Sequence, residues 1–315
     1  MLPQVYRGRA RGPGWTSVSY GLYRSVHLCE LADELLAWSL VLPEAAAFTH
    51  LTGAELRQWW LPERVAHPVF AAVGETTTCP HRPGLHVTRH RPALPTEVVD
   101  GIRITTGAET MLALARDLSV LDLVILGDSA LRLEHCTLDE LRSSADQRRR
   151  GAPRLRTVIP LLDLRSESPW ESILRMLHWA ADVEVEPQKV IVDGFGRFVA
   201  RVDLLVKGTR RVHEYDGAGH REKEVHRDDL SRDRRLVEND WQRVGFTAPQ
   251  LLFEPAEIIA MTDRLLGRPW DPRRLTRWQR LLDDSLLRPP GRARTARRWS
   301  LTGPETVDRL RPKGP

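Results

Sequence analysis

The sequence predicts an α/β (α+β) protein, and three observations carry that prediction. Helical and strand-like segments alternate along the chain. Its 315 residues are enough for two domains of ordinary size. With 41% hydrophobic and 28% charged residues, the composition is that of a soluble globular protein, which excludes a disordered or fibrous chain. No apolar run approaches the roughly 20 residues of a membrane helix, so no membrane partner is expected.

The first domain, residues 1–150, is expected to mix short strands with helices. Residues 28–40 have apolar side chains at helical spacing. Thr52 could cap a short helix that ends before Pro62. Further strands are expected at residues 67–73, 85–90 and 101–105, and further helices at residues 110–118, 120–132 and 138–150.

The composition changes after Gly151, which predicts a linker over residues 151–167 and a second domain over residues 168–285. Residues 286–315 form a basic tail rich in Pro and Arg. Five arginines fall between Arg288 and Arg298 without an acid, and this composition predicts no stable fold. Such a tail serves either as a solvated extension or as a nucleic-acid arm.

The second domain opens on a helix start at Ser168, with Pro at the first helical position and Glu171 two residues later. Glu171 is therefore either half of a capping box or an acidic group that faces the sheet, and local physics favours the cap. A hairpin turning at Asp193-Gly194 follows. Its second strand reaches residue 206, and the next elements are a strand at 211–215, a helix at 225–240 and a strand from Trp241 to near Phe253.

Two carboxylates in these strands point to function. Strand alternation places Asp203 and Glu214 where adjacent antiparallel strands bring them side by side. Like charges in that position repel, so packing gives no reason for them. A divalent cation, Mg²⁺ or Mn²⁺, would turn this repulsion into binding. The pair therefore predicts a metal site.

Residues 168–253 resemble the restriction-endonuclease-like PD-(D/E)XK superfamily, in its Vsr-like actinobacterial branch. The resemblance rests on the order of Glu171, Arg201-Val202-Asp203, Glu214-Tyr215-Asp216-Gly217, His220, Asp229, Arg232-Asp233 and Leu236. It implies a mixed sheet flanked by helices and metal-dependent cleavage of DNA. It also implies that Asp203 and Glu214 are the core metal ligands, Glu171 a further acidic group and the Tyr215 carbonyl a further ligand.

The catalytic scheme departs from the superfamily at Asp216, which stands where a lysine is usual. His220 is the best substitute, as a general base or a group that polarises water, and an equal alternative is that it fills a loop. Arg201, Asp229 and Arg232 are expected to support nucleic acid or structure. Arg232 could contact a phosphate or Glu214, or join Asp229 and Asp233 in a solvated charge network.

The first domain resembles AbiEi-type antitoxin proteins. The resemblance rests on four short segments, at residues 49–54, 86–89, 101–106 and 128–132. It implies a DNA-binding winged helix, of which only a remnant near residues 20–24 is expected, and a possible toxin or other protein partner.

The charge agrees with a nucleic-acid partner. The net charge is +5, and 43 of the 47 basic residues are arginines, which suit phosphate contacts although a GC-rich genome also explains the bias. Three scattered cysteines and an N-terminus without an apolar signal predict a cytoplasmic protein. The sequence thus predicts an Mg²⁺-dependent DNA endonuclease, with a non-enzymatic antitoxin-like regulator as the alternative.

Overall fold

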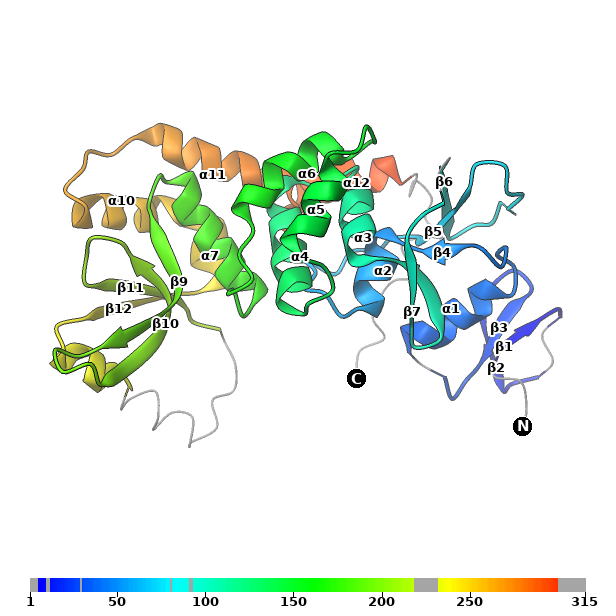
Figure 1. The fold of residues 1–315 in the computed structure, drawn as a ribbon, viewed down its shortest axis with the longest axis horizontal. Coiled ribbons are helices and arrows are strands. Elements are labelled where there is room, and N and C mark those ends of the chain that lie inside the picture. The colour runs from blue at the N-terminus through cyan, green and yellow to red at the C-terminus, as the bar shows by residue number, and fades with distance from the viewer. Residues whose placement is uncertain are drawn as a thin grey trace.

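The computed structural model describes residues 5–9, 12–28, 30–79, 81–90, 93–217 and 232–299. It confirms the mixed α+β class, with helices and three separate sheets (Figure 1). Two of the sheets lie toward the N-terminal end of the long axis, the third lies at the opposite end, and helices fill the middle. None of the described helices is long and apolar enough to cross a membrane.

The N-terminal part begins with a three-stranded antiparallel sheet in the order β1-β3-β2. A five-stranded sheet follows in the order β6-β5-β4-β8-β7, in which β5 runs parallel to β6 and β4 parallel to β8. The element bounds are β1 (Val5–Arg7), β2 (Trp15–Ser19), β3 (Leu22–Ser25), α1 (Leu31–Ser39), β4 (Ala47–Phe48), α2 (His50–Leu56), β5 (Val69–Gly74), β6 (Leu85–His90), β7 (Thr96–Val99) and β8 (Ile102–Thr105).

The predicted cap at Thr52 is wrong, because the N-cap of α2 is Thr49, three residues earlier. Thr52 lies inside the helix and is buried. Its hydroxyl accepts a hydrogen bond from the backbone N–H of Phe70, at 2.9 Å, and so ties α2 to β5. The local sequence predicted that the Thr52 hydroxyl caps its own helix, whereas its hydrogen-bond donor is Phe70 of strand β5, 18 residues later.

Helices form the middle of the molecule, and their bounds are α3 (Gly107–Leu114), α4 (Val120–Arg132), α5 (Leu138–Ala145), α6 (Ala152–Val158) and the 3₁₀ turn η1 (Ile159–Leu161). The predicted helix at 120–132 is confirmed, whereas the one at 138–150 ends at Ala145. The segment expected as a linker holds α6 and η1. The largest apolar core extends from Leu51 to Trp299, so it includes residues of both predicted domains.

The C-terminal part carries a four-stranded sheet in the order β12-β11-β10-β9, on which α7 packs. The hairpin between β9 and β10 turns where predicted, and the Asp193 side chain accepts hydrogen bonds from the N–H groups of Phe195 and Arg197. Strand β12 runs parallel to β11, and residues 232–238 between them are helical. The bounds are α7 (Pro169–Ala180), β9 (Val185–Val192), β10 (Phe198–Val206), β11 (Arg211–Tyr215), β12 (Gln242–Phe246), α9 (Ala248–Phe253), α10 (Pro255–Leu265), α11 (Pro272–Asp284) and α12 (Pro289–Arg298).

Two predictions for the C-terminal third are wrong. The last strand ends at Phe246, and residues up to Phe253 form α9 behind a capping box between Thr247 and Gln250. In the basic tail expected over residues 286–315 to lack a fold, residues 289–298 form helix α12, whose anchor Trp299 is only 4% exposed, and residues 300–315 lie outside the described residues. The prediction considered only the arginine-rich composition, whereas burial of this large tryptophan side chain stabilises the helix.

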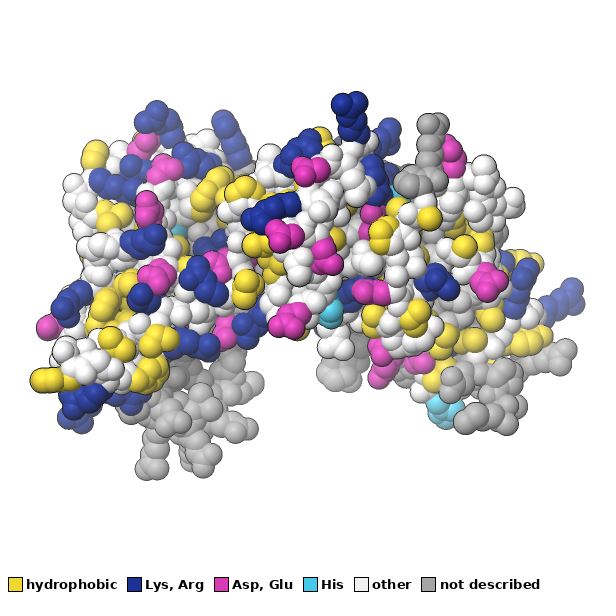
Figure 2. Space-filling view, in the orientation of Figure 1, with side chains coloured by type: hydrophobic (Ala, Val, Ile, Leu, Met, Phe, Trp, Pro, Cys, Tyr) yellow, Lys and Arg dark blue, Asp and Glu magenta, His cyan; other side chains and the backbone are white. Residues whose placement is uncertain are grey.

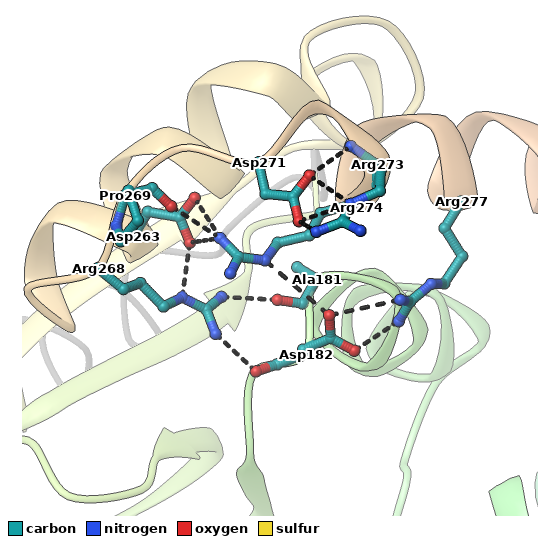
Figure 3. A network of polar contacts seen from close by, with 9 residues as sticks. All are labelled: Ala181, Asp182, Asp263, Arg268, Pro269, Asp271, Arg273, Arg274 and Arg277. Atoms are coloured by element: carbon teal, nitrogen blue, oxygen red, sulfur yellow. Dashed lines mark hydrogen bonds and ion pairs between the residues drawn. The ribbon is translucent and has the colours of Figure 1, made fainter.

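A polar network joins the end of α7 to α10 and α11 (Figure 3). Arg268 donates to the carbonyl oxygens of Ala181 and Asp182, at 2.6 and 2.7 Å, where α7 has unpaired carbonyls. The buried Asp263 accepts from Arg268 and from Arg274. This network fixes the helices behind the sheet that carries the predicted carboxylates.

Candidate functional site

The register of two strands brings the predicted carboxylates together. Leu204 of β10 pairs with His213 of β11, so the next pair in the antiparallel register is Asp203 with Glu214. One oxygen of Asp203 accepts a hydrogen bond from the Tyr215 N–H at 3.0 Å. The structure thus confirms that the two side chains are neighbours, while their role as metal ligands stays a prediction.

Glu171 approaches the pair from the first turn of α7 and also has the structural role expected for it. Its N–H donates to the Ser168 hydroxyl at 3.2 Å. Its carboxylate accepts from the N–H of Glu167 at 2.8 Å, so the cap closes one residue before the position that a standard capping box uses. Burial raises the pKa of Glu171, and these hydrogen bonds oppose that change.

Gln188 is a site residue that the sequence reasoning missed. Its side-chain amide donates to Glu171 at 2.9 Å. Its backbone has a φ of 51°, a left-handed conformation that an ordinary L-residue adopts at a cost of about 1–2 kcal/mol. The residue lies between Pro187 and Lys189, which pair with Leu204 and Val202, so it faces Asp203 across the ladder. No local signal in a strand of this composition announces such a kink.

The pKa of Asp203 is strongly raised by its surroundings. Burial raises its pKa to about 7, and the nearby charges of Glu171 and Glu214 act in the same direction. The hydrogen bond from Tyr215 and the charge of Arg232 oppose the rise without cancelling it. Near neutral pH, this carboxyl group therefore divides between its protonated and its ionised form.

Glu214 has a packing explanation after all, which corrects the expectation that none exists. Arg232 and Arg243 both form ion pairs with its carboxylate, which is nearly buried. The predicted contact of Arg232 with Glu214 is thus confirmed, and Arg232 also donates to the carbonyl oxygen of Arg201 at 2.8 Å. Arg243 was missed because it reaches Glu214 only through the parallel pairing of β12 with β11.

Asp216 belongs to the same group of ion pairs. It accepts from Arg243 at 2.6 Å, and its own N–H donates to the Phe246 carbonyl at 2.8 Å. Its carboxylate lies against Gly245, where a Cβ atom would overlap it, so this close approach requires glycine. Burial lowers the pKa of Arg243, but pairing with Glu214 and Asp216 outweighs burial and raises it above its usual value. Asp216 thus serves here as an ion-pair acceptor.

The remaining predicted site residues lie around this group. Arg201 pairs with Glu167 at 2.7 Å, and Glu167 also pairs with Arg132 of α4. The Tyr215 ring stacks on Trp170, with centroids 5.2 Å apart, and holds the start of α7 against β11. His220 and Asp229 lie outside the described residues.

A buried histidine pair supports β11 from its other face. Nδ1 of His178 contacts the Leu174 carbonyl at 2.8 Å and therefore carries the proton, so its Nε2 accepts from Nδ1 of His213 at 2.7 Å. That leaves Nε2 of His213 buried without a partner among the described atoms. Burial lowers the pKa of His178 to about 4 and, with the charge of its neighbour, that of His213 to about 2. The pair is neutral near pH 7.

The metal-binding potential of this region depends on Asp203 and Glu171. No hydrogen bond from the described residues reaches the second carboxylate oxygen of either group. Oxygen donors of this kind suit Mg²⁺ and Mn²⁺. Among the described residues, no group of three or more His, Cys, Asp or Glu side chains is arranged to hold a metal ion, and the third carboxylate of the region, Glu214, is paired with two arginines.

Known proteins provide little further information. The chain is 29% identical over 173 residues to the uncharacterized proteins MT2308 of Mycobacterium tuberculosis strain CDC 1551 / Oshkosh and Rv2248 of strain H37Rv. The alignment covers 54% of this chain and 64% of each relative. No family model and no solved structure matches the chain. The resemblances to PD-(D/E)XK nucleases and AbiEi-type proteins stay predictions.

Proposed function

We propose that the protein is a metal-dependent endonuclease that hydrolyses phosphodiester bonds of DNA. One observation carries the proposal: Asp203 is a largely buried carboxyl group with Glu171 and Glu214 nearby, and burial, together with the charges of these two neighbours, raises its pKa to about 7. A carboxylate cluster that favours protonation will also favour a divalent cation. The arginine-rich charge of the chain supports a polyanionic substrate.

Asp203 and Glu171 would hold Mg²⁺ or Mn²⁺ through their open oxygens. The cation would supply a water of lowered pKa and neutralise charge on the phosphate. Arg232 and Arg243 fix Glu214 beside Asp203. The Tyr215 N–H fixes one oxygen of Asp203 and leaves the other for a ligand. Cys79 and Cys136 are free, which supports a cytoplasmic location for this activity.

Calorimetric titration with Mn²⁺ tests the metal site, and cleavage of duplex DNA in Mg²⁺ or Mn²⁺ tests the activity. We expect binding and cleavage by the wild type and neither by Asp203→Ala. The variant Asp139→Ala is a matched control, because Asp139 is an exposed residue of α5 whose one ion-pair partner among the described residues is Arg142, three residues away. Equal heats for both variants, or cleavage that persists in Asp203→Ala, would contradict the proposal.

A second candidate is a non-enzymatic, antitoxin-like regulator that binds DNA or a toxin on a nuclease scaffold. The observation that favours it is the occupation of Glu214 by Arg232 and Arg243, together with an acid in place of lysine at position 216. This function predicts DNA or partner binding that Asp203→Ala leaves unchanged and that requires the first domain or α12. The Mn²⁺ titration separates the two candidates.

A further inference from the structure

A second polar feature lies in the middle of the molecule, away from the carboxylates. It is an open cleft of about 810 Å³ between the residues that follow α3 and the loop that joins α5 to α6. Six arginines line it against two acids, Asp117 and Asp146. Figure 2 shows Lys and Arg side chains gathered over the α5–α6 loop. The arginines are Arg116, Arg148, Arg149, Arg150, Arg154 and Arg156.

Three of these arginines are positioned by the protein itself. Arg149 pairs with the buried Glu109, with one N–O distance of 2.6 Å. Arg154 donates to the Leu118 carbonyl at 2.6 Å, and Arg156 donates to the Ala145 carbonyl. A bond to a neutral carbonyl does not cancel the positive charge, so Arg154 and Arg156 form fixed, charged parts of the wall.

The other three arginines have open guanidinium groups. Among the described residues, the side chains of Arg116, Arg148 and Arg150 take part in no hydrogen bond or ion pair. Asp117, one of the two lining acids, is engaged by His50 at 3.2 Å and by the indole N–H of Trp299 at 3.4 Å. The cleft therefore keeps an excess of positive charge that the protein does not neutralise.

The backbone makes this arrangement possible at one glycine. Gly151 has a φ of 92°, and a Cβ atom there would overlap the carbonyl oxygen of Leu112. The turn therefore needs glycine, and it brings Arg150 and Arg154 over the chain that follows α3.

We propose that this cleft binds the phosphate backbone of duplex DNA. Guanidinium groups form paired hydrogen bonds with phosphate oxygens. No aromatic side chain is among the cleft's lining residues, so the cleft offers phosphate contacts without a ring on which a base could stack. This feature favours a polymer backbone over a free nucleotide. The inference rests on the proposed action on DNA and adds the surface that holds the duplex.

The test is fluorescence anisotropy with a labelled duplex of mixed sequence, measured in EDTA from about 50 to 300 mM salt. We compare the wild type with the triple variant Arg116→Ala, Arg148→Ala and Arg150→Ala. We expect at least a 10-fold loss of affinity at about 150 mM salt, and a log–log salt slope smaller by about 3, because each lost phosphate contact removes about one unit. The matched control is Arg103→Ala, Arg264→Ala and Arg280→Ala, exposed arginines outside this cleft that likewise have no side-chain partner among the described residues. We expect less than a 3-fold effect from it.

Equal losses in both triple variants would overturn the proposal, since only general charge would then matter. Inorganic pyrophosphate or a nucleoside triphosphate that binds the wild type when the duplex does not would overturn it in favour of a small anion. Circular dichroism checks the fold of each variant, and Arg148→Glu with Arg150→Glu, both at exposed positions, provides a second test if the triple variant unfolds. EDTA removes any metal effect, so a protein that binds Mn²⁺ through Asp203 but no duplex refutes the cleft and leaves the metal site standing.

Discussion

The substitution Asp203→Asn tests the electrostatics of the candidate site directly. Asparagine keeps the shape and still accepts the hydrogen bond from the Tyr215 N–H, but it removes the charge that burial, Glu171 and Glu214 disfavour. The pKa of Asp203 rises from 3.8 to about 7 on folding. About three units correspond to an upper bound of about 4 kcal/mol.

The sign of the effect follows from proton linkage. Because the folded state holds the proton more tightly, the free energy of unfolding of the wild type falls as pH rises from about 4 to about 7. The advantage of Asp203→Asn should be absent below pH 4 and greatest above pH 7. Urea unfolding in EDTA at a series of pH values measures it, and Asp139→Asn, which changes an exposed acid, is the control.

A difference that does not depend on pH, or a loss of stability at pH 8, would refute this reasoning. Adding Mn²⁺ at pH 8 extends the experiment. If Mn²⁺ binds the ionised carboxylate of Asp203, it should raise the unfolding free energy of the wild type and leave that of Asp203→Asn unchanged.

Three further predictions concern buried or closely packed residues, two of them beside the site and one at the end of α12. Burial lowers the pKa values of His178 and His213, so we expect stability to fall as pH drops below about 6.5, by up to about 2 kcal/mol per histidine at pH 5. Leucine at both positions should flatten this slope in urea titrations. Gly245→Ala should cost about 1–3 kcal/mol through overlap with Asp216, and Asp216→Gly in the same chain should recover part of it. Trp299→Ala should lower the unfolding free energy by about 3–5 kcal/mol, whereas an unfolded tail would show no change.

The sequence by itself determined the local features of this protein. Caps and turn residues act within a few residues of each other, so Ser168 correctly placed the start of α7 and Asp193-Gly194 the hairpin. Strand alternation with a short connection was also enough to place Asp203 beside Glu214. The prediction from composition was wrong at α12. Its many arginines indicated an unfolded segment, but the buried side chain of Trp299 anchors the helix.

Only the tertiary structure decided how the charges are satisfied. Arg243 reaches Glu214 through a parallel strand pairing, and Gln188 reaches Glu171 through a backbone kink, and neither contact has a local sequence signal. The sequence shows that arginines are abundant around residues 148–156, but it does not show which of them have partners within the protein. Arg149 pairs with Glu109 and Arg154 with the Leu118 carbonyl, and both partners are distant in sequence. The free energy of a charge depends on its neighbours and its burial, which the fold alone assembles.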